Sequence, residues 1–186
     1  VTVGRALLAL GRVEEAGRRF DEAVLHFESA GEARAVDCAA ALSGRGEVRM
    51  LSGDLAGSIA DERRAYEITA AALGETDSRT LEHRSNMAVL QTEGGTFAEA
   101  VLIFRQILAV LEPSEGANSP KVLNIVLNLA TALDSAGETA EALPLFEQGW
   151  VCVGRADELA NPGDQRAFRI GAEGILVVRD LDGELR

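Results

Sequence analysis

Residues 95–108, GTFAEAVLIFRQIL, have counterparts at a constant interval of 42 residues along the chain. The related segments are GRVEEAGRRFDEAV from Gly11, GDLAGSIADERRAY from Gly53 and GETAEALPLFEQGW from Gly137. In three of the four copies, an aromatic residue stands nine residues after the glycine. These residues are Phe20, Phe104 and Phe146, and the second copy has Glu62 at this position. A period in this range, marked by small and aromatic residues, is typical of a helical solenoid whose units pack on their neighbours.

Hydrophobic periodicity predicts two helices in each repeat, an A helix before the repeat glycine and a B helix after it. Glycine suits this connection because it adopts the left-handed backbone that commonly ends a helix. Thr96 with Glu99 has the spacing of a capping box, and Ser119 precedes a first-turn proline, so both predict helix starts. The predicted B helices are 13–30, 55–73, 97–111 and 139–155, and the predicted A helices are 2–10, 33–51, 79–93, 120–136 and 165–181.

The segment 95–100, GTFAEA, together with Phe104 resembles the tetratricopeptide repeat (TPR). The period of 42, longer than the usual 34, resembles the subclass found in kinesin light chains and bacterial signalling ATPases. That subclass carries L-G-x-x-H-P-x-T-L followed by N-N-L-A. Here LGETDSRTL at 73–81 precedes SNMA at 85–88, and LNLA follows at 127–130. The second repeat departs from the pattern, with Gly44-Arg45-Gly46 at the place of Asn-Leu-Ala.

The resemblance implies an all-α chain that forms one right-handed superhelical solenoid of antiparallel helix pairs, with A helices lining a concave groove. The repeats would be about 1–32, 33–74, 75–116 and 117–162, followed by a terminal helix in 163–186. Such domains bind peptides or proteins, and in groove-binding members an asparagine on each A helix holds the ligand backbone. Asn86 and Asn128 occupy that position here. A solvent-facing or helix-bonding role for either amide is the alternative.

The predicted groove face is rich in carboxylates, which favours a basic or hydrogen-bond-rich partner by charge complementarity. We expect it to include Glu47, Glu82, Asn86, Glu93, Asn124, Asn128, Asp134, Glu173 and Asp180. The principal hypothesis is therefore a scaffold that binds a peptide or protein in the groove. The alternatives are a structural protein that stacks head to tail into filaments, and a regulatory or sensor module of a larger signalling enzyme.

Composition argues against other classes of partner. The net charge is −12 with a pI near 4.6, so the chain lacks the basic surface that nucleic-acid binding requires. The uncharged run 122–133 is too short to span a bilayer. Cys38 and Cys152 have no metal-ligand spacing and are expected to be core residues in a reducing cytoplasm.

The sequence carries no recognisable catalytic, metal or cofactor motif, and we predict that the chain is not an enzyme. Lys121 lacks the glycine-rich neighbourhood of a phosphate-binding loop, and His26 and His83 lack metal-ligand spacing. A nucleophile elbow of the form G-x-S-x-G is absent. Paired acids such as Asp61 and Glu62 are expected on solvent-facing sides of B helices.

Two places leave alternatives open. Arg45 and Arg49 occupy positions that are mostly apolar in later copies, so either the helix is rotated, the arginines lay their stems over the core, or they form a functional pair. At the chain ends, Ile175 and Val178 on the predicted terminal helix would expose an apolar face. We expect head-to-tail association if the chain is complete, and caps from flanking sequence if it is an excerpt.

Overall fold

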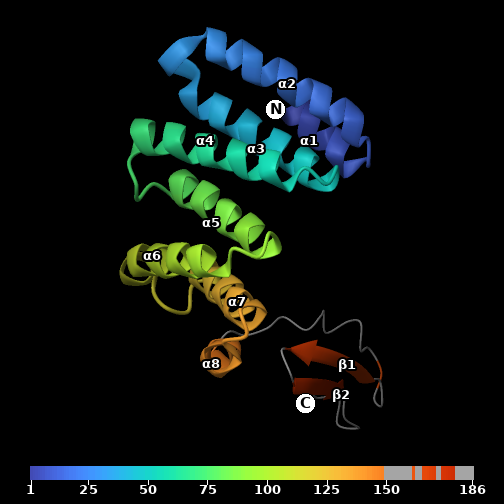
Figure 1. The fold of residues 1–186 in the computed structure, drawn as a ribbon, viewed down its shortest axis with the longest axis vertical. Helices are drawn as coiled ribbons and strands as arrows, with labels where there is room; N and C mark the ends of the chain where they lie inside the picture. The colour runs from blue at the N-terminus through green and yellow to red at the C-terminus, as the bar shows by residue number, and fades with distance from the viewer. Residues whose placement is uncertain (149–160, 162–164, 171–172, 179–186) are drawn as a thin grey trace.

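The computed structural model describes residues 1–148, 161, 165–170 and 173–178, and within residues 1–148 every regular element is helical. The elements follow one another from the N-terminus as a stack of packed neighbours (Figure 1). They are α1 (Thr2–Ala9), α2 (Val13–Ser29), the 3₁₀ helix η1 (Gly31–Arg34), α3 (Ala35–Leu51), α4 (Leu55–Leu73), α5 (Ser78–Glu93), α6 (Phe97–Glu115), α7 (Pro120–Ser135) and α8 (Thr139–Gln148). The predicted all-α class of antiparallel helix pairs is confirmed.

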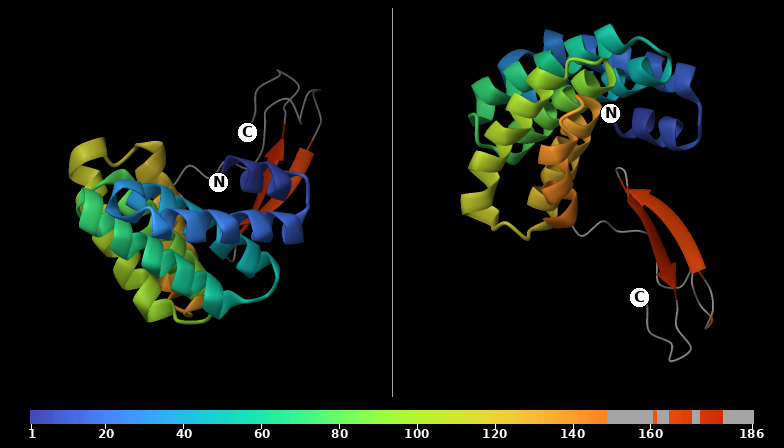
Figure 2. Two further views of the ribbon diagram at one scale, coloured as in Figure 1. Left: turned by 90° about the horizontal axis from the view of Figure 1, so that it is seen from above. Right: turned by 60° about the horizontal axis from the view of Figure 1, so that its bottom comes forward.

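Consecutive helices pack in the order of the sequence, and the stack follows a curved path (Figure 2). The A helices are α1, α3, α5 and α7, and the B helices are α2, α4, α6 and α8. Besides its sequence neighbours, each of α5 and α7 also contacts the other, as do α1 and α3. The division of the whole chain into one solenoid remains a prediction, and the remainder of the helix predicted for 139–155 lies outside the described residues.

The four repeat glycines end or follow the A helices in a left-handed backbone. Their φ values are 71° at Gly11, 83° at Gly53, 80° at Gly95 and 83° at Gly137. This is the region that glycine enters without steric penalty, so the predicted role of the period is confirmed.

The two predicted helix starts have different outcomes. Ser119 caps α7 by accepting a hydrogen bond from the Val122 backbone N–H, with Pro120 in the first turn, as expected. The capping box at Thr96 does not form. Its hydroxyl donates to the Gln91 carbonyl, and Glu99 accepts from the Gln91 side chain instead of reaching back to the helix start. Gln91 of the preceding helix thus engages both residues of the predicted box, and α6 begins without a side-chain cap.

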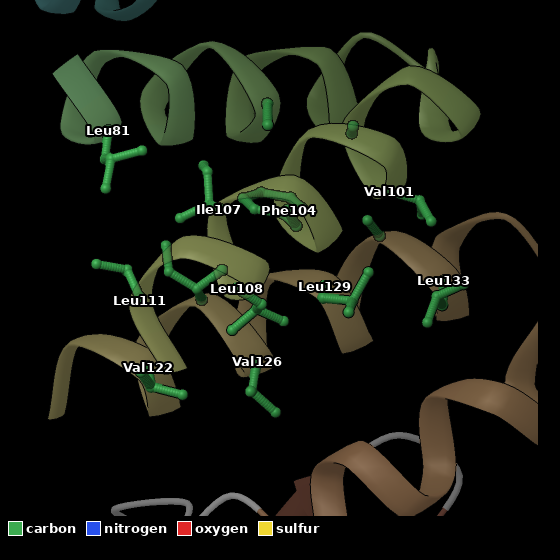
Figure 3. Close-up of a cluster of buried hydrophobic side chains, with 14 of the residues drawn as sticks. Leu81, Val101, Phe104, Ile107, Leu108, Leu111, Val122, Val126, Leu129 and Leu133 are labelled. Atoms are coloured by element: carbon green, nitrogen blue, oxygen red, sulfur yellow. The ribbon is translucent and has the colours of Figure 1, made fainter. Parts of the chain in front are cut away.

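Among the described residues, two separate apolar clusters form the core. The larger joins α5, α6, α7 and α8 (Figure 3), and the smaller joins α2, α3 and α4. Phe20 and Phe104 are fully buried, as predicted, whereas Phe146 is only partly buried against the larger cluster. Cys38 is buried in the smaller cluster, and Cys152 lies outside the described residues.

The ring of Phe20 explains the departure of the second repeat. A Cβ atom on Gly4 of α1 would lie 2.7 Å from the ring, and a Cβ atom on Gly44 of α3 would overlap it. Phe20 therefore lies against two helices at positions where only glycine leaves enough space. Gly44 stands at the position of Asn86 and Asn128 in the later repeats. An asparagine side chain at this position would overlap the Phe20 ring.

The terminal helix predicted at 165–181 is wrong over residues 165–170 and 173–178, the part of it that the structure describes. Residues Gln165–Ile170 form β1 and Glu173–Val178 form β2, which pair antiparallel with Ile170 opposite Glu173 and Phe168 opposite Ile175. Gly171 and Gly174 stand inside the segment, where each glycine costs a helix about 1 kcal/mol relative to alanine. The β-branched residues at 175, 177 and 178 favour a strand.

This correction changes two further predictions. Glu173 and Ile175 lie on a strand and not on a groove-facing helix, and Asp180 lies outside the described residues. The apolar helix face that head-to-tail stacking required at this end is absent from 165–170 and 173–178. At the N-terminal side, Val3 of α1 is 60% exposed and Leu10, directly after α1, is 71% exposed.

We predict that Phe104→Ala lowers the free energy of unfolding by about 3–5 kcal/mol, because a fully buried ring leaves a cavity. Chemical denaturation monitored by far-ultraviolet circular dichroism measures the change. Leu102→Ala on the same helix is the control, since Leu102 is 57% exposed and its loss should change stability by less than about 0.5 kcal/mol. Similar losses in both variants would contradict the assigned packing.

Two glycines of α3 provide a matched pair. Gly44→Ala should destabilise the chain by about 1–3 kcal/mol, because the new methyl group overlaps the buried Phe20 ring. In Gly46→Ala the methyl group meets its nearest atom, the Ser58 carbonyl oxygen, at 3.4 Å, and alanine stands at the equivalent positions 88 and 130. This second change should be neutral or stabilising by up to about 1 kcal/mol through helix propensity. Equal effects in thermal melts would exclude the proposed close packing.

Candidate functional site

A groove of about 520 Å³ lies between α5 and α7, the A helices of consecutive repeats, with α6 beneath. Its floor is aliphatic and formed by Leu81, Ile107, Leu111 and Ile125. Its rim is mostly polar and includes Ser78, Glu82, Ser85, Asn86, Lys121 and Asn124, together with Pro120. An apolar floor with a few polar groups around it is the usual composition of a ligand pocket.

The groove brings together three of the residues predicted for it. Glu82, Asn86 and Asn124 line it, and Glu82 and Asn124 are exact repeat equivalents 42 residues apart. Because Glu82 and Asn86 are four residues apart, they share one face of α5. The period also relates Ser78 to Pro120 at the groove entrance, a correspondence that could have added both to the prediction.

The other predicted residues lie away from this groove's lining. Glu93 is the exposed last residue of α5. Asp134 is half-buried near the end of α7 and accepts a hydrogen bond from the Thr139 hydroxyl at 3.2 Å. Asn128 donates through Nδ2 to Asn124 Oδ1 at 3.4 Å, an exposed contact along α7.

Asn86 contacts a buried carboxylate that sequence reasoning placed in solvent. Its Nδ2 donates to Glu62 Oε1 at 3.2 Å, and Glu62 is only 5% exposed. The same oxygen accepts from the Ser43 hydroxyl at 2.6 Å, and Oε2 lies 2.9 Å from His83 Nδ1. The prediction of a solvent-facing Glu62 is wrong, because polar side chains of α3 and α5 surround it.

Asp61 is buried in the same way, with 3% of its surface exposed, so its predicted position in solvent is also wrong. Arg45 binds it in a bidentate manner at 2.9 and 2.7 Å, and Arg49 adds a contact at 2.8 Å. The hydrogen bond to Asp61 raises the pKa of Arg45, while burial opposes the rise. Both arginines neutralise a buried acid between α3 and α4, a contact that the sequence analysis did not predict.

A nucleophilic triad consists of the residue types found at Ser43, Glu62 and His83. The contacts among these three side chains are not those of a triad. In a triad the imidazole lies between the hydroxyl and the carboxylate and accepts the hydroxyl proton. Here the hydroxyl of Ser43 donates directly to Glu62, and His83 is only 7% exposed. The arrangement therefore joins three helices rather than activating a nucleophile.

Within the described residues no group of three or more His, Cys, Asp and Glu side chains could hold a metal ion. None of the described helices combines the length and apolar character needed to cross a membrane.

Comparison with known proteins places the architecture. No protein-family model and no curated protein matches the sequence. A structure from Podosopora anserina, of a protein assigned as a kinesin light chain with nearly identical TPR-like repeats, matches with a TM-score of 0.71 at 20% identity. It covers 79% of this chain and 70% of the other. This chain has a TPR-like fold.

A second TPR-like match is BtubC (BKLC) from P. vanneervenii, with a TM-score of 0.71 at 16% identity over 90% of this chain and 66% of the other. The predicted structural resemblance to kinesin-light-chain-like repeats is thus confirmed over most of the chain. Repeat solenoids of this kind generally present concave surfaces to protein partners, and their fold alone implies no chemistry.

We predict that the two repeat asparagines differ in their effect on stability. Asn86→Ala removes a hydrogen bond to a buried carboxylate and should lower the free energy of unfolding by about 1–3 kcal/mol. Asn128→Ala removes only an exposed contact and should change it by less than about 0.5 kcal/mol. Urea denaturation of both variants measures the difference, and equal losses would show that Glu62 does not depend on Asn86.

Proposed function

We propose that this TPR-like chain is a protein-interaction scaffold that binds an extended peptide segment in the groove between α5 and α7. The single observation that carries the proposal is the groove itself, whose aliphatic floor lies between polar side chains of two consecutive A helices. A peptide can bury an apolar side chain on such a floor while its backbone bonds the polar rim.

The groove offers both kinds of hydrogen-bonding group. Ser85 on α5 can donate or accept, while Glu82 only accepts. Across the groove, Lys121 only donates, and Asn124 retains an Nδ2 donor because its Oδ1 receives Asn128. A peptide backbone also presents alternating donors and acceptors, so neither wall excludes it.

Charge supports a basic partner. The chain carries a net charge of −12, and Glu82 makes no ion pair with the described residues, whereas Lys121 on the opposite wall is already paired with Glu115. A basic segment would therefore meet a free carboxylate and little opposing charge. This complementarity acts mainly on association rate and specificity.

The alternative of head-to-tail stacking has less support. It required an apolar helix face at each end of the solenoid, and residues 173–178 form a strand instead. The regulatory-module alternative is compatible with the same groove, since a sensor domain can also act by binding a peptide.

We expect Glu82→Lys to weaken the binding of basic peptides several-fold without changing stability, because it reverses the charge of an exposed groove residue. An array of synthetic 12-residue peptides identifies binders, and fluorescence anisotropy of labelled peptides gives their affinities. In the unmodified chain, raising the salt concentration from about 0.05 M to about 0.5 M should also weaken the binding of basic peptides, because exposed charges become screened.

Glu67→Lys is the matched control, because Glu67 is an exposed residue of the B helix α4 and does not line the groove. It makes the same charge change and should leave affinity within about twofold of the unmodified chain, apart from the long-range charge effect. If both variants weaken binding equally, the peptide does not occupy this groove. Failure of every peptide to bind would reject the proposed function.

A further inference from the structure

The orientation of one groove side chain is set from outside the groove. Asn86 lines the groove on α5, and its Nδ2 donates to Glu62 of α4. Glu62 is held in turn by Ser43 and His83, so the carboxylate has contacts from α3 and α5. The B helix behind the groove therefore reaches a residue that faces a ligand.

A carboxylate decides which end of an amide faces it. An ionised carboxylate only accepts hydrogen bonds, whereas an amide has one donor end and one acceptor end. Glu62 therefore binds the Nδ2 end of Asn86, and the orientation of the amide follows from this contact. The Oδ1 atom has no hydrogen-bond partner among the described residues, so the amide has an acceptor left for a ligand.

The next repeat has no carboxylate at the position that would orient its asparagine. Phe104 takes the place of Glu62, and Asn128 takes the place of Asn86, 42 residues later. Within the described part of the chain, the Nδ2 of Asn128 bonds only to the exposed Asn124 on its own helix. A ring accepts no such hydrogen bond from the amide, so the orientation of Asn128 is not imposed from the B helix.

Glu82 extends the acceptor character of the α5 wall. It is exposed, lies one turn before Asn86 on the same helix face, and lines the same groove. The wall thus combines a carboxylate and an amide oxygen, both of which only accept in this arrangement. Charged donors form stronger hydrogen bonds to such oxygens than neutral donors do.

We propose that Glu62 is a positioning residue of the groove. By binding Nδ2 of Asn86, it leaves Oδ1 for the ligand, so that the α5 wall selects peptides that place a lysine or arginine side chain against Glu82 and Asn86. This inference rests on the proposed function, because it specifies the partner of the same groove.

The orientation can be tested without a ligand. In the ¹⁵N-labelled chain, the side-chain amide protons of Asn86 should exchange with solvent more slowly than those of Asn128. Glu62→Met should remove the difference, because methionine fills the space but accepts only weakly. Equally fast exchange of both amides in the unmodified chain would overturn the proposal.

The selectivity is tested with pairs of synthetic peptides that are identical except for one residue, which is lysine or norleucine. The unmodified chain should bind the lysine peptide about tenfold more tightly, a typical effect of a charged hydrogen bond. Glu62→Met and Asn86→Leu should each reduce this ratio several-fold, chiefly by weakening the binding of the lysine peptide. Asn128→Leu is the matched control and should leave the ratio intact.

The outcomes separate the inference from the proposed function. If peptides bind but the ratio is unchanged in a folded Glu62→Met, Glu62 does not position the groove, and the scaffold function stands. If neither peptide of any pair binds, the proposed function fails and the inference fails with it. Should Glu62→Met not fold, the amide exchange of Asn86 in the unmodified chain and the ratio in Asn86→Leu decide the matter together. Exchange as fast as that of Asn128, or an unchanged ratio, overturns the inference.

Discussion

The packing of the solenoid depends on the side chain that stands nine residues after each repeat glycine. In the first two repeats, this side chain lies between the A helices on either side of its B helix. Phe20 shows the constraint most clearly, because Gly4 of α1 and Gly44 of α3 leave space for its ring. Phe104 takes the equivalent place in the larger cluster and is also fully buried. What stands at this position determines which residues the neighbouring A helices can carry.

Glu62 places a carboxylate at the same position, and the surroundings change accordingly. Its neighbours Ser43, His83 and Asn86 all bring polar groups, because a buried carboxylate is stable only with hydrogen-bond partners. Asp61, the preceding residue, is neutralised by two arginines of α3. The two apolar clusters lie on opposite sides of this polar region. The groove between α5 and α7 adjoins it, which is how a core residue comes to affect a ligand-facing amide.

Periodicity was sufficient to predict the helices but not the chemistry between them. The second B helix was predicted at 55–73, and α4 spans Leu55–Leu73, because glycine turns and apolar spacing act locally. The burial of Asp61 and Glu62 could not be deduced from α4 alone, since two adjacent acids are usually solvated. The arginines of α3 were the missing signal, because they replace apolar residues on the helix that packs against these acids.

The groove shows the same division between local and long-range information. Its α5 and α7 residues follow from the period, whereas its floor includes Ile107 and Leu111 of a B helix that the prediction treated only as core. The period predicts a helix at 165–181, whereas the glycines and β-branched residues at 171–178 favour a strand locally, and the described residues follow the local preference.

The ion pair between Asp61 and the arginines of α3 also bears on how a repetitive chain avoids folding in the wrong order. Similar repeats can exchange partners during folding, and misassembly of this kind is characteristic of repeat proteins. If α5 took the position that α3 occupies against α4, Asp61 would meet Met87 and Gln91, which stand where Arg45 and Arg49 do. Removing both cations from a buried carboxylate that is otherwise paired with them is strongly unfavourable. The charges of the second repeat therefore favour the pairing of α4 with α3 over its pairing with another A helix in the same position.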